Sequence, residues 1–159
     1  MLKLLGALLI FFCGAALAAS LNAGARNALI QTEGFIELVR RLRSDIDCFS
    51  MPIPLAISRF PDTLFEKCGL QFEACDGVRA FDDLICNCDM AYEELRDIMD
   101  SFALHIGRGY KLEQLAICDR TVERLEAHRL HLANQLPAKQ KTNGTLCLCG
   151  ALAVVILIV

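Results

Sequence analysis

Residues 81–106 read FDDLICNCDMAYEELRDIMDSFALHI, and this stretch decides the fold that the sequence predicts. Large apolar residues recur in it at steps of three and four, with acidic residues between them. Such spacing is typical of an amphipathic helix that has one face in a protein core and the other in water. We therefore expect one helix over 81–106. Its apolar face consists of Phe81, Leu84, Ile85, Cys88, Tyr92, Leu95, Met99, Phe102 and Ile106.

Three further helices follow from similar patterns. The first covers about 20–46, the second begins at Pro61 and extends to Cys75, and the fourth covers 111–136 and ends at Pro137. Prolines break the connector over 48–60, because a proline lacks an N–H and restricts the residue before it. Asp76-Gly77 is a turn. The predicted core positions of the first and fourth helices are Phe35, Ile36, Val39, Leu42 and Ile46, and Leu112, Leu115, Cys118, Val122, Leu125 and Leu132.

The predicted fold class is all-α. No stretch shows the sustained apolar alternation that is typical of a β-strand. Four amphipathic helices with mostly short connections favour an antiparallel bundle, here a small one that disulfides staple. The domain organisation that we predict is a signal peptide at 1–18, a helical domain at 19–137, a polar linker at 138–145 and an apolar tail at 146–159.

Both ends of the chain are apolar. Lys3, the apolar run over 4–13 and the pair Ala16 and Ala18 have the order of a secretory signal peptide. The uncharged tail over 146–159 spans only about 21 Å as a helix, whereas a bilayer core is about 30 Å thick. We expect a GPI-anchor signal or a short membrane segment, and a buried C-terminal helix is a third alternative. Asn143 is the candidate GPI attachment site, and it also lies in a glycosylation sequon.

Six cysteines lie between the two ends. An even number in an oxidising compartment favours disulfides over a metal site, and zinc sites usually have C-x2-C pairs that this chain lacks. Matching heights along antiparallel helices pairs Cys48 with Cys118. The same argument pairs Cys68 and Cys75 with Cys86 and Cys88, in either order.

Composition and motifs exclude several activities. The net charge is −3, there is no basic tract and Trp is absent, so nucleic acid is not an expected partner. No hydrolase elbow, phosphate loop or metalloprotease motif occurs, and we expect neither enzymatic activity nor a cofactor nor a metal. His128 and His131 are predicted to form an exposed pair on the fourth helix. Arg120 and Arg124 are candidates to pair with the acidic face of 81–106.

One stretch resembles a known family. Cys48-Phe49, the prolines after it, Leu64-Phe65-Glu66-Lys67-Cys68 and Phe72-Glu73-Ala74-Cys75 are similar to the nematode chondroitin proteoglycan 4 domain, over about residues 45–120. The resemblance implies a secreted helical cysteine domain of the extracellular matrix. It implies no catalytic residue, and the chain has no Ser-Gly dipeptide to carry a chondroitin chain.

These features together predict an extracellular, membrane-tethered, non-enzymatic binding or structural module. Its partners are an extracellular protein and the membrane, which it contacts through the tail. It is either secreted or anchored at the cell surface. The alternative is a secreted helical ligand that acts through a receptor.

Overall fold

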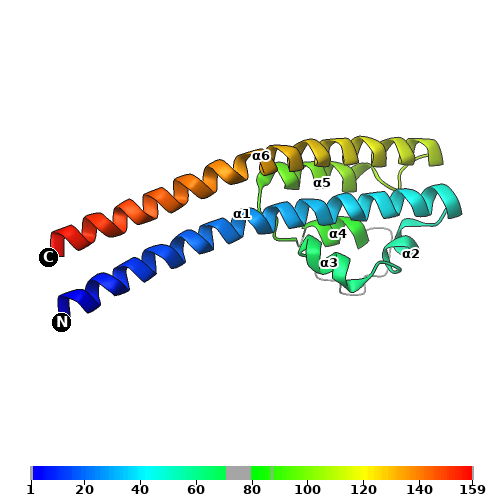
Figure 1. The fold of residues 1–159 in the computed structure, drawn as a ribbon. Coiled ribbons are helices and arrows are strands. Elements are labelled where there is room, and N and C mark those ends of the chain that lie inside the picture. Colours follow the sequence, from blue (N-terminus) through cyan, green and yellow to red (C-terminus); the bar gives the residue numbers. More distant parts are fainter. Residues whose placement is uncertain (1, 71–79, 87, 159) are drawn as a thin grey trace. The chain divides into compact units, whose positions relative to one another are not determined.

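The computed structural model describes the backbone of residues 2–70, 80–86 and 88–158 (Figure 1). The described residues form six helices and no strand, which confirms the all-α class. The disulfide staples are not shown, because the described cysteines are free thiols. The helices are α1 (Leu2–Phe49), α2 (Ile53–Ile57), α3 (Asp62–Cys68), α4 (Ala80–Cys86), α5 (Glu93–His105) and α6 (Lys111–Ile158).

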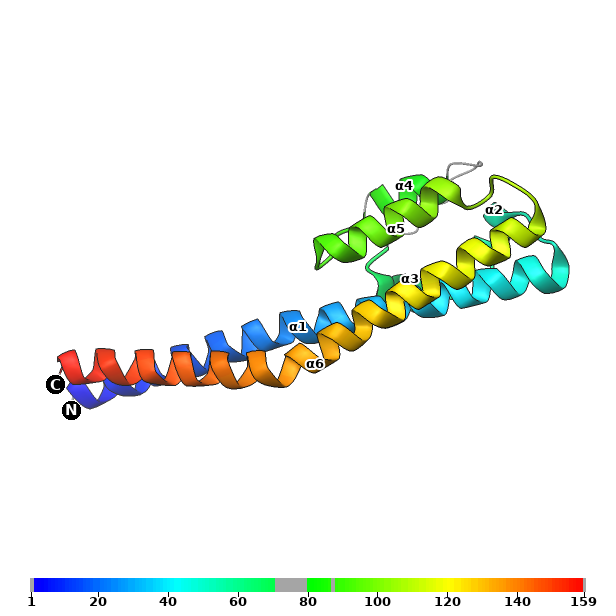
Figure 2. The same ribbon diagram turned by 90° about the horizontal axis from the view of Figure 1, so that it is seen from above.

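The chain divides into two compact units. The body comprises residues 28–131, and the terminal unit comprises residues 1–27 and 132–159. Within the terminal unit the beginning of α1 and the end of α6 place both termini at the same end (Figures 1 and 2). Among the described residues, no helix combines the length and the apolarity that crossing a membrane requires.

Helix α1 is longer at its N-terminal end than the sequence indicates. We expected a helix from about residue 20, but α1 begins at Leu2 and continues without interruption to Phe49. The predicted signal segment is therefore helical and continuous with the next helix. The core positions that we predicted over 35–46 are all buried, so the apolar stripe is confirmed. The helix ends where Ser50 adopts a left-handed φ of 47°.

The connector and the second helix differ from the prediction. The two prolines do not prevent a helix: Pro52 is the N-cap of α2 and Pro54 lies in its first turn, where no intrahelical N–H bond is lost. Helix α3 ends at Cys68 because Gly69 has a φ of 73° and caps it in the left-handed conformation. The extension toward Cys75 that we expected is wrong at Gly69, and residues 71–79 lie outside the described residues.

The helix predicted over 81–106 consists of two helices. Helix α4 ends at Cys86 and α5 begins at Glu93. The apolar pattern runs through the interruption because α4, the intervening segment and α5 all face the same core: Phe81, Cys88 and Leu95 are each buried. A periodicity in buried residues therefore does not require a continuous backbone helix.

Helix α6 continues through Pro137, where we predicted that it would end. A proline within a helix removes one backbone hydrogen bond and its ring crowds the preceding turn, at a cost of about 3 kcal/mol. The residues on both sides of Pro137 are nevertheless helical. Of the core positions predicted for this helix, Leu112 is wrong: 79% of it is exposed.

Within the body, α1 and α6 are antiparallel neighbours. Ion pairs join them, and the residue numbers of the α6 partners fall as those of the α1 partners rise. Helices α4 and α5 lie along this pair (Figure 2). Phe81 and Phe102 meet edge to face with ring centroids 5.5 Å apart, joining α4 to α5. The α1–α6 pairs are Glu33–Arg129, Arg40–Glu126 and Arg43–Asp119.

Candidate functional site

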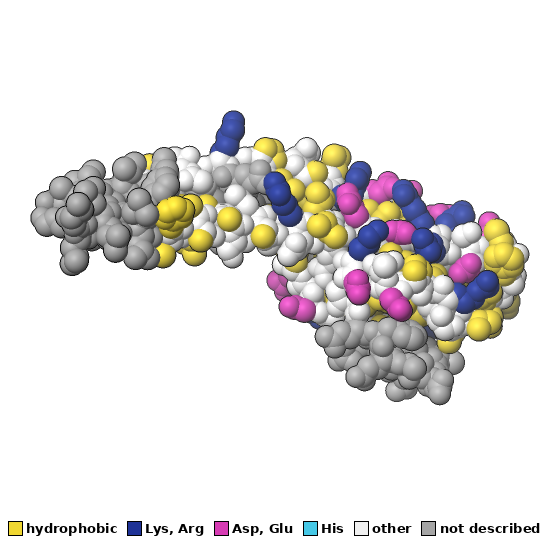
Figure 3. Space-filling view, turned by 60° about the horizontal axis from the view of Figure 1, so that its bottom comes forward, with side chains coloured by type: hydrophobic (Ala, Val, Ile, Leu, Met, Phe, Trp, Pro, Cys, Tyr) yellow, Lys and Arg dark blue, Asp and Glu magenta, His cyan; other side chains and the backbone are white. Residues whose placement is uncertain are grey.

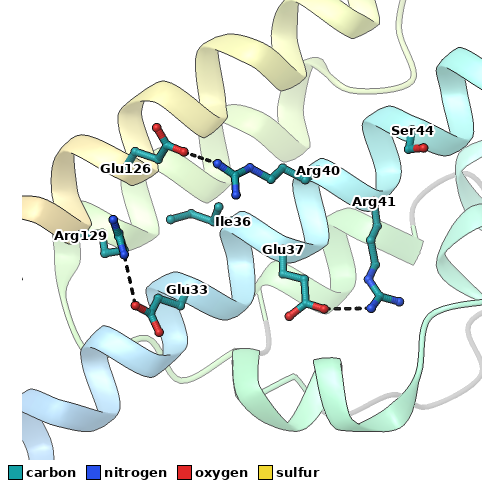
Figure 4. A pocket seen from close by; sticks show the side chains of 8 residues that line it. All are labelled: Glu33, Ile36, Glu37, Arg40, Arg41, Ser44, Glu126 and Arg129. Atoms are coloured by element: carbon teal, nitrogen blue, oxygen red, sulfur yellow. Dashed lines mark hydrogen bonds and ion pairs between the residues drawn. The ribbon is translucent and has the colours of Figure 1, made fainter.

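A charged pocket of about 520 Å³ lies between α1 and α6 in the body (Figure 4). Its carboxylates are all engaged by cations. Arg129 Nη1 lies 3.4 Å from Glu33 Oε1, and Arg40 binds Glu126. Arg41 binds Glu37 at 2.9 Å. Only one side chain of the lining, Ile36, is a large apolar residue.

Glu37 is the carboxylate of this pocket whose electrostatics its neighbours change most clearly. Partial burial acts to raise the pKa of Glu37, but hydrogen bonds and charge from Lys67 and Arg41 outweigh it and lower the pKa. Lys67 Nζ is 3.3 Å from Glu37 Oε2. Lys67 and Arg41 therefore stabilise the ionised carboxylate, and the lowered pKa makes Glu37 a weaker base. Its pairs hold α1 to α3 through Lys67 and brace α1 itself through Arg41.

A second feature is an apolar surface at the end of the body where α1 ends and α6 begins. We call it the tip surface. It gathers large apolar side chains that water reaches, and Figure 3 shows hydrophobic residues collected at this end. Helix α5 ends there and α6 begins, because Gly107 and Gly109 turn the chain with φ values of 80° and 126°. The tip surface consists of Phe49 (66% exposed), Leu55 (53%), Leu104 (54%), Tyr110 (83%) and Leu112 (79%).

The cysteines that we predicted to form disulfides differ in their exposure to water. Cys48 and Cys86 are exposed, whereas Cys68, Cys88 and Cys118 are buried. The structure brings Cys68 and Cys88 together, since the Cys88 thiol donates to the Cys68 carbonyl at 3.4 Å. Cys75 lies outside the described residues. The disulfide pairing stays a prediction.

Burial also controls the reactivity of these thiols. Burial raises the pKa of Cys68 and of Cys118 to about 12, and it raises the pKa of Cys88 as well. At pH 8 a thiol with a pKa of about 12 is ionised in only about one molecule in ten thousand. Because the thiolate is the reactive form, these three thiols should be inert in the folded chain.

We expect Cys48 and Cys86 to react with a thiol reagent at pH 8 within minutes, and Cys68 and Cys118 to react only after unfolding. Mass spectrometry of the labelled peptides measures each site separately. Labelling of the exposed Cys48 and Cys86 shows that the reagent reaches the chain. If the predicted disulfides form instead, Cys48 and Cys118 should both stay unlabelled even in denaturant, because they are bonded to each other.

Gln31 is a structural residue that the sequence analysis did not identify. It is 8% exposed. Its Nε2 donates to the carbonyls of Cys68 and Asp89, each at 2.9 Å, and its Oε1 accepts from the Ala91 N–H at 3.1 Å. One side chain of α1 thus connects the end of α3 with the segment between α4 and α5. The signal was available: Gln31 is a polar residue four positions before Phe35, on the apolar stripe.

The histidine prediction is half wrong. His128 is 3% exposed, not on the surface, while His131 is exposed. The His128 Nδ1 lies 3.0 Å from Glu94 Oε2, and its ring meets Tyr92 edge to face. Its Nε2 is buried without a hydrogen-bond partner among the described residues. No group of three or more metal-binding side chains occurs in the part of the chain that the structure describes.

The fold and these surfaces define a class of protein: an all-helical chain whose charged pocket is internally paired and which exposes several large apolar side chains at one end of the body. The sequence model of the stage III sporulation protein AB family matches residues 3–159. The chain therefore belongs to this bacterial sporulation family. No curated protein and no solved structure matches it.

The family corrects several predictions. The resemblance to the nematode chondroitin proteoglycan 4 domain is wrong, because it depended on cysteine spacing, which unrelated helical proteins can share. The extracellular matrix module and the secreted receptor ligand are wrong for the same reason. So are the secreted or cell-surface localisation and the GPI anchor at Asn143. Asn143 lies within α6, and its side chain lies outside the described residues.

Proposed function

We propose that this chain acts in sporulation as a non-enzymatic binding module, which its apolar ends hold at a membrane and which offers the tip surface to a protein partner. The observation that carries the proposal is the exposure of large apolar side chains at the tip. A cluster of large apolar side chains exposed to water is typical of an interaction site. The role in sporulation is inferred from the family, and the apolar contact with a protein partner is inferred from the tip surface.

Leu112 is the clearest of the tip residues. It falls on the apolar stripe of α6, one turn before the half-buried Leu115, yet 79% of it is exposed. Covering a leucine side chain completely contributes about 1.5–3 kcal/mol. Several such side chains at one end of the body could therefore supply a useful part of a binding energy.

The membrane part of the proposal depends on the terminal unit. The uncharged run over 146–159 and the apolar run over 4–13 belong to the same unit, with both termini at one end. Phe12 and Leu17 are also 64% and 59% exposed there. A pair of apolar helix ends favours transfer from water into a lipid environment.

The lack of an enzymatic role is likewise part of the proposal. It is supported by the charged pocket, where ion pairs occupy the carboxylates that could act as acid or base. Disulfides have no assigned part in the function. A bond between Cys68 and Cys88 would join two residues that already touch.

We expect Leu112→Asp to lower the yield of heat-resistant spores at least about tenfold in a strain in which this chain is the sole family member. An aspartate at the centre of an apolar contact costs more than about 1.4 kcal/mol, because its charge must be dehydrated on binding. Leu130→Asp is the matched control, since Leu130 lies on the same helix and is 59% exposed but is outside the tip surface. The assay is the count of spores that survive heating.

Fractionation of the same cells tests the membrane part separately. Both aspartate variants should remain in the membrane fraction at the abundance of the parent chain, whereas a chain truncated after residue 145 should become soluble. Normal spore counts with Leu112→Asp would contradict the role of the tip. A truncated chain that stays with the membrane would contradict the role of the tail.

A further inference from the structure

A groove of about 460 Å³ opens beside the tip surface, between the end of α5 and the first turns of α6. We call it the tip groove. Leu104 and Arg108 line its α5 side, and Ala116, Ile117 and Arg120 line its α6 side. The side chains on α6 recur at helical spacing, so they form one continuous strip along the helix.

The floor of the tip groove is apolar. Ile117 is half-buried and packs against the hydrophobic core, while Leu104 and Ala116 are exposed. Leu112 lies four residues before Ala116, on the same face of α6, and extends the apolar strip toward the tip. The floor is thus packed against the core at Ile117 and exposed at Leu104 and Ala116, where a partner would enter.

The rim of the tip groove is positively charged. Neither the Arg108 nor the Arg120 guanidinium makes an ion pair or hydrogen bond with any residue that the structure describes. The pairing of Arg120 with the acidic face of the predicted 81–106 helix is thus not seen among these residues. By contrast, Arg40 and Arg129 of the body are both paired.

The one carboxylate among the lining residues, that of Glu113, already accepts a hydrogen bond within the chain. Glu113 Oε2 accepts the backbone N–H of Tyr110 at 3.1 Å, which fixes the first turn of α6. The groove therefore combines an apolar floor with two uncommitted guanidinium groups. Such groups bind carboxylates with paired, charge-assisted hydrogen bonds.

We propose that the tip groove binds an amphipathic helix of a protein partner, with aliphatic side chains on the face that enters the groove and Asp or Glu along its edges. The proposal rests on the proposed function and adds the chemistry of the partner. An amphipathic helix fills a groove between two helices with apolar side chains at positions i, i+3, i+4 and i+7. A bilayer surface fits less well, because it does not fill a recess between two helices.

The test measures binding of a designed peptide to the full chain in detergent micelles by fluorescence anisotropy. The probe is a labelled helical peptide of about 18 residues, with leucines on one face and glutamates elsewhere. We expect a dissociation constant in the micromolar range, which the double variant Arg108→Glu/Arg120→Glu weakens at least about tenfold. Leu112→Asp should weaken it by a similar factor, and added salt should weaken the parent chain but not the double variant.

Three controls make the result specific. A peptide of the same composition in scrambled order, without an apolar face, should not bind. A peptide with lysines in place of the glutamates should bind the parent chain weakly and the double variant better. Arg124→Glu is the matched charge reversal, since Arg124 is exposed on the same helix but does not line the groove; it should change binding less than about threefold.

Several outcomes would overturn the proposal. One is equal binding of the glutamate and lysine peptides. Another is a double variant that binds like the parent chain. Loss of flotation of the double variant with phosphatidylglycerol vesicles would assign the groove to lipid instead. A dimer that the double variant dissociates in sedimentation would assign it to a second copy. If Leu112→Asp blocks sporulation but no acidic peptide binds, the proposed function stands and this partner chemistry fails.

Discussion

Leu95→Ala should lower the free energy of unfolding by about 2–5 kcal/mol. Leu95 is completely buried in the core of the body, near the beginning of α5. Its truncation removes apolar contacts and leaves a cavity that close-packed neighbours fill only in part. Chemical denaturation followed by circular dichroism measures the change.

Asp97→Ala is the control for this substitution. Asp97 lies on the exposed acidic face of the same helix, two residues away, and its replacement should stay within about 0.5 kcal/mol. Equal losses from the two variants would mean that α5 presents the opposite face to the core.

Gln31→Leu should cost about 3 kcal/mol or more, although leucine has a similar size and is more apolar. The substitution removes the Gln31 hydrogen bonds to the carbonyls of Cys68 and Asp89 and from the N–H of Ala91, and only the Cys68 carbonyl keeps a second donor, the Cys88 thiol. A buried or part-buried polar group that loses a hydrogen bond costs about 1 kcal/mol or more, so the three losses together reach about 3 kcal/mol. Because the three groups lie in two separate segments, we also expect faster amide exchange at Ala91.

Gln114→Leu provides the comparison. Gln114 also donates to a backbone carbonyl, that of Gly109 at 3.0 Å, but this single bond is exposed. Water can replace it, so the loss should be below about 1 kcal/mol. A Gln31 variant that unfolds like the Gln114 variant would show that the three bonds contribute little to stability.

Periodicity predicted those parts of the fold in which a helix face meets the core. The stripe around Phe35 and Leu42 and the buried face around Leu95 follow from residue spacing alone, because burial of an amphipathic face is the main source of helix stability here. The same method joined α4 to α5, since it detects which residues are buried and not whether the backbone between them is helical.

Local signals failed where context decided the outcome. Gly69 ended α3 through its left-handed conformation, whereas Pro137 did not end α6. Leu112 was assigned to the core because its spacing fits the stripe, but the stripe continues past the point where the body covers it. The tip surface therefore could not be recognised until the neighbours of Leu112 were known.

Function was harder to predict than fold. Two apolar ends and an even number of cysteines favoured secretion, but the same features occur in other helical proteins. The buried thiols of Cys68, Cys88 and Cys118 behave as small apolar side chains, a role that needs no oxidising compartment. The match to the sporulation family, which covers residues 3–159, excluded the extracellular matrix module and the secreted ligand.

The ion pairs between α1 and α6 have a consequence for how the two helices align during folding. Exposed pairs of this kind each contribute only about 0–1 kcal/mol to stability. However, each helix carries both acidic and basic partners, so the pairs favour one alignment of α1 with α6 over the shifted ones. A slip of one helical turn would set Glu33 against Glu126, and a slip in the other direction would set Arg40 against Arg129.

Either slip exchanges an attraction for a repulsion while leaving many apolar contacts available. The charges thus discriminate between registers that the hydrophobic stripe alone would tolerate. Because salt screens exposed charges, refolding at high ionic strength should yield more chains trapped in a shifted alignment, even where the native state itself loses little stability.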